Sequence, residues 1–117
     1  MNTFKQYDDY FVRPTLHPET THAWFAYPVM VKPDAPFSAQ DLRTFLEEKK
    51  IETRPIMSGD YTKQPLFKLF PTKTHGDLTN TKKIHTQGFF FGNHAGIRQP
   101  QLDYIAACFD EFITKRK

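Results

Sequence analysis

The sequence predicts a small α+β domain: a sheet of three or four strands packed by two main helices, with a long irregular loop. The chain has 117 residues, a length suited to one domain, and its aromatic content of 15% excludes a disordered chain, which would lack large apolar groups to bury. Hydrophobic patterns occur in the order strand, helix, strand, long loop, strand and helix. Pro14 and Pro18 interrupt regular structure near the start. We therefore divide the chain into an irregular lead-in over residues 1–20 and a single domain over residues 21–117.

Three segments have the composition of β-strands. Residues 21–32 are rich in aromatic and β-branched side chains, and residues 51–57 form a shorter segment interrupted by Pro55. Residues 88–92 are a run of three phenylalanines between glycines, which predicts a fully buried strand. Pro28 has no backbone N–H for a ladder, so we expect an edge strand or a bulge at that point.

Two segments have the pattern of amphipathic helices. Ser38 is a favoured N-cap residue, and Asp41 three positions later predicts a capping box. The apolar residues that follow at helical spacing are Leu42, Phe45 and Leu46. The second helix begins at Pro100, and its apolar face consists of Leu102, Ile105, Phe109, Phe112 and Ile113. Cys108 lies on that face, so we expect a core residue rather than a nucleophile.

The long segment between Met57 and Gly88 has no strong period, and only residues 80–85 suggest a helical turn. Connections of this length inside a small domain are uncommon and usually functional or packed on something else. The segment also carries apolar side chains that are costly to leave in water: Tyr61, Leu66, Phe67, Leu69 and Phe70. Two interpretations remain open: the loop covers a surface outside this chain, or it folds over its own sheet.

Charge and cysteine content favour a cytoplasmic protein. The net charge is +3, and the lysine-rich stretch between Lys63 and Lys83 fits a solvated loop better than a phosphate-binding surface. The longest nearly apolar run covers residues 23–31, far short of the ~20 residues that span a bilayer, so we expect no membrane association. A single cysteine excludes an intramolecular disulfide and suits a reducing compartment.

The sequence contains no recognisable motif of the kinds that independent catalysis uses. None of the five histidines is spaced i, i+4 with another, and the cysteine has no partner, so we expect no metal site. We find no glycine-rich phosphate loop, no G-x-S-x-G motif and no close carboxylate pair on a helix. We therefore assign no catalytic residue and expect the chain alone to be inactive.

Two segments carry candidate binding residues. Arg54 lies on a predicted strand that runs into a polar turn, where its planar guanidinium can bind a phosphate or carboxylate. The alternative is a surface ion pair with Glu52 or Asp60. The second segment follows the phenylalanine strand: it can place His94 at the edge of a site, or Asn93 can simply form the turn.

The sequence around these segments resembles the C-terminal small domain of the DegT-like nucleotide-sugar aminotransferase family. The resemblance covers nearly all of residues 10–114, and its motifs are Phe11-Val12-Arg13-Pro14, Trp24-Phe25-Ala26-Tyr27-Pro28-Val29, Lys50-Ile51-Glu52-Thr53-Arg54-Pro55, Gly59-Asp60, Gln64-Pro65 and Gly92-Asn93-His94. The Thr53-Arg54, Gly59-Asp60 and Gln64-Pro65 pairs, together with Leu78-Thr79-Asn80-Thr81, are most similar to the branch of the family that removes the C3 hydroxyl of 4-keto-6-deoxy sugars. The departures are Arg13, where the family usually has an apolar residue, and His22-Ala23 before the tryptophan.

The resemblance implies pyridoxal-phosphate chemistry on a nucleotide-linked sugar, in a two-domain subunit of a homodimer that serves deoxysugar and surface-polysaccharide biosynthesis. The cofactor, as pyridoxal or pyridoxamine phosphate, is held by the family's large domain, so we expect this chain alone to bind none. By the same resemblance, Arg54 and the turn with Ser58 and Asp60 meet the diphosphate or sugar, and His94 lies near the pocket. Amine transfer and dehydration both remain open, as do the nucleotide and the sugar.

The alternative function is a stand-alone RNA-binding or protein-interaction module. Gly88-Phe89-Phe90-Phe91 is similar to the aromatic strand of an RNA-recognition motif. That motif requires a small residue where Phe90 stands and a basic residue where Gln87 stands. We therefore do not expect nucleic acid as a partner.

Overall fold

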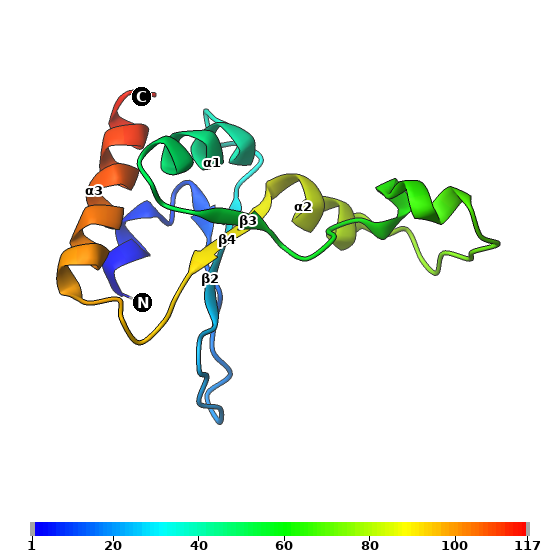
Figure 1. Cartoon of the computed structure of the whole chain (residues 1–117), viewed down its shortest axis with the longest axis horizontal. Helices are drawn as coiled ribbons and strands as arrows, with labels where there is room; N and C mark the ends of the chain where they lie inside the picture. Colours follow the sequence, from blue (N-terminus) through cyan, green and yellow to red (C-terminus); the bar gives the residue numbers. More distant parts are fainter. Residues whose placement is uncertain (1, 117) are drawn as a thin grey trace.

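The computed structural model describes residues 2–116, which form a four-stranded antiparallel sheet with helices. The strands are β1 (Phe11–Val12), β2 (Ala26–Val31), β3 (Thr53–Pro55) and β4 (Gly88–Gly92), in the spatial order β1-β2-β4-β3. The last strand of the sequence therefore lies between two earlier ones (Figure 1). The predicted α+β class and the sheet of three or four strands are confirmed.

Side chains on β4 alternate between the two faces of the sheet. Phe89 and Phe91 are buried, at 0% and 4% exposed, whereas Phe90 between them is half-buried and points to the opposite face. The prediction of a fully buried strand is therefore wrong for Phe90 and for the exposed Gly92. The two neighbouring phenylalanines are packed under the helices, so the strand does not present the open row of aromatic rings with which RNA-recognition motifs stack bases.

Pro28 lies where β2 has a hydrogen-bonded neighbour on one side only. It is opposite Phe90 in an unbroken register with β4, and β1 extends only to Met30 and Val31. The register excludes a bulge, and the edge position explains how the strand tolerates a residue without an N–H. The strand begins at Ala26 rather than at residue 21, because its partner β4 ends at Gly92 opposite Ala26.

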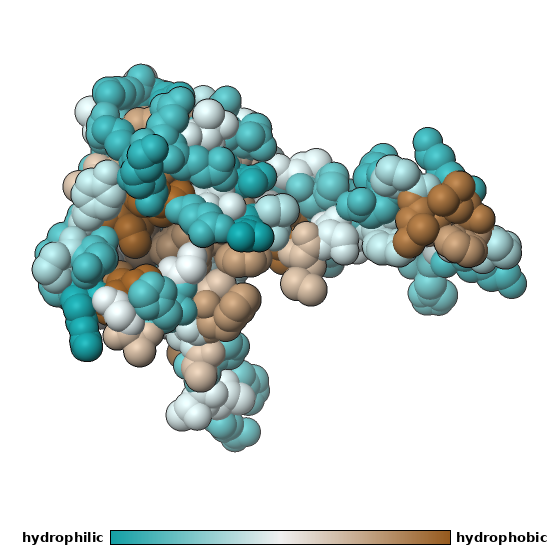
Figure 2. Space-filling view, in the orientation of Figure 1, coloured by the Kyte–Doolittle hydropathy of each residue, from teal (hydrophilic) through white to brown (hydrophobic). Residues whose placement is uncertain are grey.

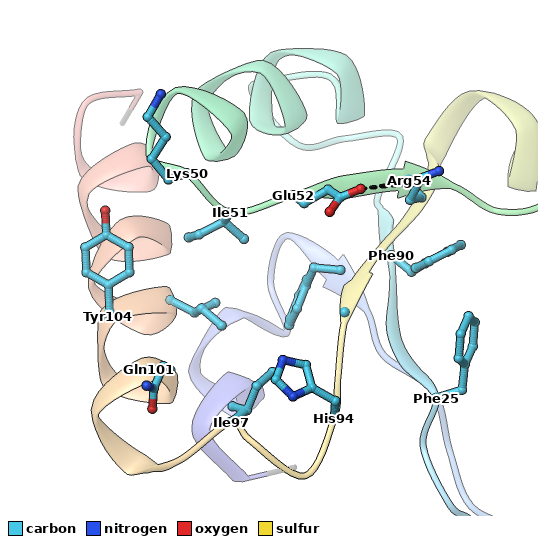
Figure 3. Close-up of a pocket in the computed structure, with 13 residues that line it drawn as sticks. Phe25, Lys50, Ile51, Glu52, Arg54, Phe90, His94, Ile97, Gln101 and Tyr104 are labelled. Carbon is cyan, nitrogen blue, oxygen red and sulfur yellow. Dashed lines mark hydrogen bonds and ion pairs between the residues drawn. The ribbon is translucent and has the colours of Figure 1, made fainter.

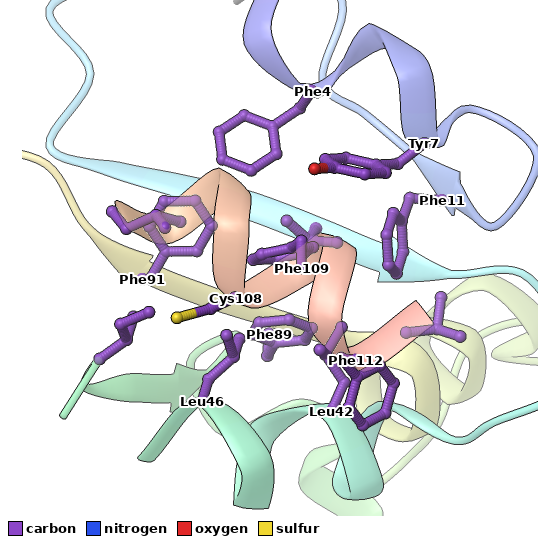
Figure 4. Packing of buried hydrophobic residues seen from close by; sticks show 14 of the residues in the cluster. Phe4, Tyr7, Phe11, Leu42, Leu46, Phe89, Phe91, Cys108, Phe109 and Phe112 are labelled. Carbon is purple, nitrogen blue, oxygen red and sulfur yellow. The ribbon is translucent and has the colours of Figure 1, made fainter. Parts of the chain in front are cut away.

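Two helices cover one face of the sheet: α1 (Ala39–Glu48) and α3 (Gln99–Thr114). The predicted capping box is present, with the Asp41 N–H donating to Ser38 Oγ at 3.1 Å and the Ser38 N–H donating to Asp41 Oδ2 at 3.0 Å. Figure 4 shows side chains of both helices meeting those of β4, and Cys108 among them is 3% exposed. The fully buried apolar residues of this core are Leu42, Leu46, Phe89, Phe109 and Phe112. No helix within residues 2–116 has the length and apolar character needed to cross a membrane.

The beginning of the chain is more ordered than predicted. Residues Asn2–Tyr7 form a 3-10 helix, η1, and Phe11–Val12 form β1, so the lead-in is irregular only from residue 13 onward. Phe4, Tyr7 and Phe11 are each buried in the core. The Tyr7 hydroxyl donates at 2.9 Å to the Ala106 carbonyl and also bonds Asp110 on α3. Burial, followed by the hydrogen bond with Asp110, raises the pKa of this phenol.

The segment between β3 and β4 projects away from the body of the molecule (Figure 1). We call residues 57–78 the arm; it contains two short 3-10 helices, η2 (Tyr61–Lys63) and η3 (Pro65–Lys68), and leads into α2 (Thr79–Gln87). The radius of gyration is 16.0 Å, above the ~13 Å typical of a compact chain of this length. The long loop does not fold over the chain's own sheet, which was one of the two interpretations left open. The helical turn predicted over residues 80–85 is a longer helix.

Candidate substrate-binding site

A cavity lies at the edge of the sheet, between the start of β3, the end of β4 and the first turns of α3. It has a volume of about 580 Å³, and Figure 3 shows its side chains. Two predicted residues, Arg54 and His94, line this cavity, and two others, Ser58 and Asp60, do not. The remaining lining residues are Phe25, Lys50, Ile51, Glu52, Phe90, Phe91, Gly92, Ile97, Gln101, Tyr104 and Ile105.

Arg54 is held at the cavity by a single carboxylate. Its Nε donates to Glu52 Oε1 at 2.9 Å and its Nη2 donates to the same oxygen at 2.6 Å. The two side chains share one side of an extended segment because they are two residues apart. Both are largely exposed, at 68% for Arg54 and 73% for Glu52. The surface ion pair that the sequence left open is present, and it lies at the rim of the cavity.

His94 follows β4 in a turn that a neighbouring side chain fixes. Asn93 Nδ2 donates to the Trp24 carbonyl at 2.8 Å, which ties the turn to the start of β2. His94 Nδ1 accepts from the Gly96 N–H at 3.0 Å, so in the neutral ring Nε2 carries the proton. The two alternatives stated for this segment therefore hold together: Asn93 forms the turn, and His94 lines the cavity.

An aromatic pair that the sequence analysis did not identify lies beside these polar groups. The rings of Phe25 and Phe90 are 6.1 Å apart at 55°, and Phe25 is 82% exposed. The period of two along a strand is the signal that finds Phe90, because it turns the middle of three phenylalanines away from the core. Phe25 has no comparable local signal. Its position depends on the pairing of β2 with β4.

Asp60 lies at the base of the arm rather than in the cavity. It is fully buried, and its Oδ1 accepts from the Thr62 N–H at 3.0 Å and the Thr62 hydroxyl at 2.6 Å, which caps η2. The hydrogen bond from the Thr62 hydroxyl is the main reason that the carboxyl pKa lies below its usual value. Ser58 is exposed, and its carbonyl accepts from Gln64 Nε2 at 3.4 Å.

A contact between the arm and α2 fixes the direction in which the arm leaves the body. The Asp60 N–H donates to His85 Nδ1 at 3.1 Å. Gly59, just before it, has φ +60, and a Cβ at this position would lie 2.4 Å from the same nitrogen. Only glycine fits this approach, which accounts for the Gly59-Asp60 step seen in the sequence.

The cavity lining contains one lysine, Lys50, and one acid, Glu52. Lys50 is the lysine of the cavity lining, and it is exposed, with its amine directed away from the cavity in Figure 3. The acid of the lining, Glu52, is already paired with Arg54. Within residues 2–116, no group of three or more histidine, cysteine or acidic side chains is arranged to hold a metal ion.

Comparisons with known proteins point to one family. Residues 3–110 match the sequence profile of the DegT/DnrJ/EryC1/StrS aminotransferase family. The lipopolysaccharide biosynthesis protein RfbH of Salmonella typhimurium is 35% identical over 99 residues, which cover 81% of this chain and 23% of that protein. The dTDP-4-dehydro-2,6-dideoxy-D-glucose 3-dehydratase of Saccharopolyspora spinosa is 29% identical over 102 residues, which cover 87% of this chain and 22% of that protein.

A solved structure agrees with these relatives. GDP-4-keto-6-deoxy-D-mannose-3-dehydratase of E. coli, with hydrated PLP bound, superposes with a TM-score of 0.80 and 25% identity, covering 92% of this chain and 27% of that one. The comparisons give no support to a stand-alone RNA-binding or protein-interaction module. The chain spans about a quarter of the length of these relatives. It matches the family profile over almost its whole length and has the fold of a small domain of PLP-dependent transferases, so the chain belongs to the DegT/DnrJ/EryC1/StrS aminotransferase family.

Proposed function

We propose that this chain forms one wall of the nucleotide-sugar pocket of a PLP-dependent aminotransferase or 4-keto-6-deoxysugar 3-dehydratase in deoxysugar or surface-polysaccharide biosynthesis. The observation that carries the proposal is the meeting of Arg54 and His94 with the Phe25–Phe90 pair around one cavity. These residues come from three separate stretches of the chain: Phe25, Arg54, and the stretch with Phe90 and His94. Their meeting is therefore a product of the fold and not of local sequence.

Each lining group has a task in such a pocket. Glu52 engages Nε and one Nη2 proton of Arg54, so within residues 2–116 the Nη1–Nη2 fork is unengaged and matches two oxygens of a diphosphate. The protonated Nε2 of His94 suits a sugar hydroxyl or carbonyl. The exposed ring of Phe25 offers an apolar face to a sugar or nucleobase.

Ser58 and Asp60 act at the base of the arm in this proposal. Asp60 is buried and engaged with Thr62, so it shapes the turn instead of binding substrate directly. The turn presents the exposed Ser58 hydroxyl, which is free to reach a sugar bound between this domain and the rest of the enzyme. In this proposal the cofactor is held by the part of the enzyme that this chain does not match.

We also propose that the complete enzyme is a cytoplasmic homodimer in which the arm packs on another surface. The apolar side chains exposed along the arm support this packing: Met57, Tyr61, Leu66, Leu69 and Phe70. Groups of this kind are normally covered in a mature assembly.

The test of the proposed function is substitution of Arg54. A charge-assisted hydrogen bond is worth about 1.5–3 kcal/mol, so Arg54→Ala should weaken binding of GDP-mannose, used as a nucleotide-sugar probe, by about ten- to a hundredfold. Arg54→Lys should restore binding only in part, because an ammonium lacks the planar fork. Calorimetry on the chain, alone and joined to a family large domain, measures the affinity.

The matched control is Lys83→Ala, which removes one positive charge from an exposed residue outside the cavity. It should leave affinity unchanged. Arg54→Ala should barely alter the melting temperature, since exposed ion pairs contribute about 0–1 kcal/mol. Unchanged affinity with a lowered melting temperature would make Arg54 a structural residue and leave His94 as the better pocket candidate.

A further inference from the structure

Glu52 is the acidic neighbour of the Arg54 guanidinium, and both residues belong to the cavity lining. Its Oε1 accepts both hydrogen bonds from Arg54, at 2.9 and 2.6 Å. Glu52 therefore binds the Nε side of the guanidinium. The opposite edge, formed by Nη1 and Nη2, remains available to a ligand. An anion bound at that edge would meet the positive charge of Arg54 at contact distance and the negative charge of Glu52 farther away.

The repulsion between Glu52 and a bound ligand depends on how much negative charge the ligand carries on the phosphate that contacts Arg54. Repulsion from Glu52 scales with the charge on the contacting group, and each extra negative charge at ~6 Å from a carboxylate lowers affinity about threefold in water and more where water is excluded. A nucleotide sugar carries a single charge on each of its two phosphates. A free nucleoside diphosphate ends in a phosphate that carries nearly two charges at neutral pH, because its second pKa is ~6.

We propose that Glu52 is a specificity-determining residue: it makes the cavity prefer the diphosphate diester of a nucleotide sugar over the terminal phosphate of a nucleoside diphosphate. The inference rests on the proposed function, since it takes Arg54 as the phosphate-binding group. Lys50, the other charged lining residue, has its amine directed away from the cavity and does not offset Glu52.

The exposure of the pair sets the size of the effect. Glu52 is 73% exposed, so water weakens its influence without removing it. It neutralises much of the attraction that Arg54 would otherwise exert on any anion. Discrimination against the extra charge of a terminal phosphate should therefore be about three- to tenfold.

The experiment compares GDP-mannose with GDP, which share the same nucleoside, on the chain joined to a family large domain and on the Glu52→Gln variant of the same protein. Glutamine keeps an oxygen to accept from Arg54 but removes the charge. Titration calorimetry at low salt should show GDP binding tightened about three- to tenfold by Glu52→Gln and GDP-mannose binding tightened by clearly less. The preference for the nucleotide sugar should fall accordingly.

Glu48→Gln is the matched control, because it removes one acidic charge from an exposed α1 residue outside the cavity lining. It should leave the ratio of the two affinities unchanged. Equal tightening of both probes by Glu52→Gln, or no change in either, overturns the role of Glu52 while Arg54→Ala still weakens both. If Arg54→Ala leaves both affinities unchanged, Arg54 is not the phosphate-binding group, so the role of Glu52 fails while His94 remains the pocket candidate. If neither probe binds, the proposed function itself fails and the role of Glu52 fails with it.

Discussion

Gly59 is a residue at which the backbone of this domain tolerates little change. Its φ of +60 is unfavourable for other residues, and an added Cβ would lie 2.4 Å from His85 Nδ1. We expect Gly59→Ala to break the hydrogen bond from the Asp60 N–H to His85. Hydrogen exchange of the Asp60 and Thr62 amides should then be at least tenfold faster, and the cap of η2 should be lost.

Gly76 provides the matched control. It has a similar φ of +74, but a Cβ there would meet no atom within 4 Å. Gly76→Ala should therefore impose only the conformational cost of about 1 kcal/mol and leave exchange at Asp60 and Thr62 unchanged. Equal exchange in the two variants would show that the approach to His85 does not hold the arm.

Individual site residues were predictable to different degrees. Arg54 and His94 have side chains whose chemistry stands out in a linear sequence, and both line the cavity. Asp60 is a site candidate only through the family resemblance, and its carboxylate is fully buried and caps η2. Phe25 was missed because its partner Phe90 is distant in sequence and meets it only after β2 and β4 pair.

At the scale of a single element, the capping box of α1 is a local device with a measurable contribution. Ser38→Ala removes the oxygen that accepts from the Asp41 N–H, which should cost about 1 kcal/mol of unfolding free energy and lower the melting temperature by about 4 °C. Ser58→Ala is the control, because the Ser58 hydroxyl makes no hydrogen bond within the described residues. If Ser38→Ala lost no more stability than Ser58→Ala, the cap would not contribute measurably to the stability of α1.

The same capping box predicts how α1 responds to acid. The hydrogen bond from the Ser38 hydroxyl, followed by the one from its N–H, lowers the pKa of Asp41 below its usual value. A carboxyl whose pKa is lower in the folded state stabilises the fold above its unfolded pKa, and this contribution is lost as pH falls through the folded pKa. Asp41→Asn should therefore be less stable than the parent at neutral pH, and the difference should shrink in strongly acid solution; thermal unfolding across pH measures it.

Elements with local signals were predicted well, and elements that depend on distant partners were not. The start of α1 follows from Ser38 and Asp41, whose interaction spans one helical turn. The two-residue strand β1 has no signal of its own, because it exists only through pairing with Met30 and Val31. Strand ends were overestimated for the same reason: β3 begins at Thr53 because that residue lies opposite Phe91.

The whole molecule is a compact body with an arm that carries exposed apolar side chains, and this arrangement predicts association. Figure 2 shows an apolar patch toward the far end of the arm. Among the apolar side chains of the arm, Leu69 and Phe70 are 72% and 60% exposed. Replacing both with serine should reduce self-association in analytical ultracentrifugation and reduce binding of a hydrophobic dye. The melting temperature should stay unchanged, because neither side chain belongs to the core.

Replacement of two exposed polar residues, Thr72→Ser and Thr74→Ser, is the control for the arm and should change neither property. If the parent chain is strictly monomeric at high concentration and binds no dye, the arm is not an association surface. The arm would then be a solvated extension.

The position of β4 determines what happens when the polypeptide is cut within the arm. The arm separates β3 from β4 in sequence, yet β4 lies between β2 and β3 in the sheet, and α3 beyond it packs against α1 and η1. The residues before the arm and those after it are thus interleaved in one core. A polypeptide cut within the arm would remain a single folded body made of two complementary fragments, held by the sheet and not by the peptide bond that was lost.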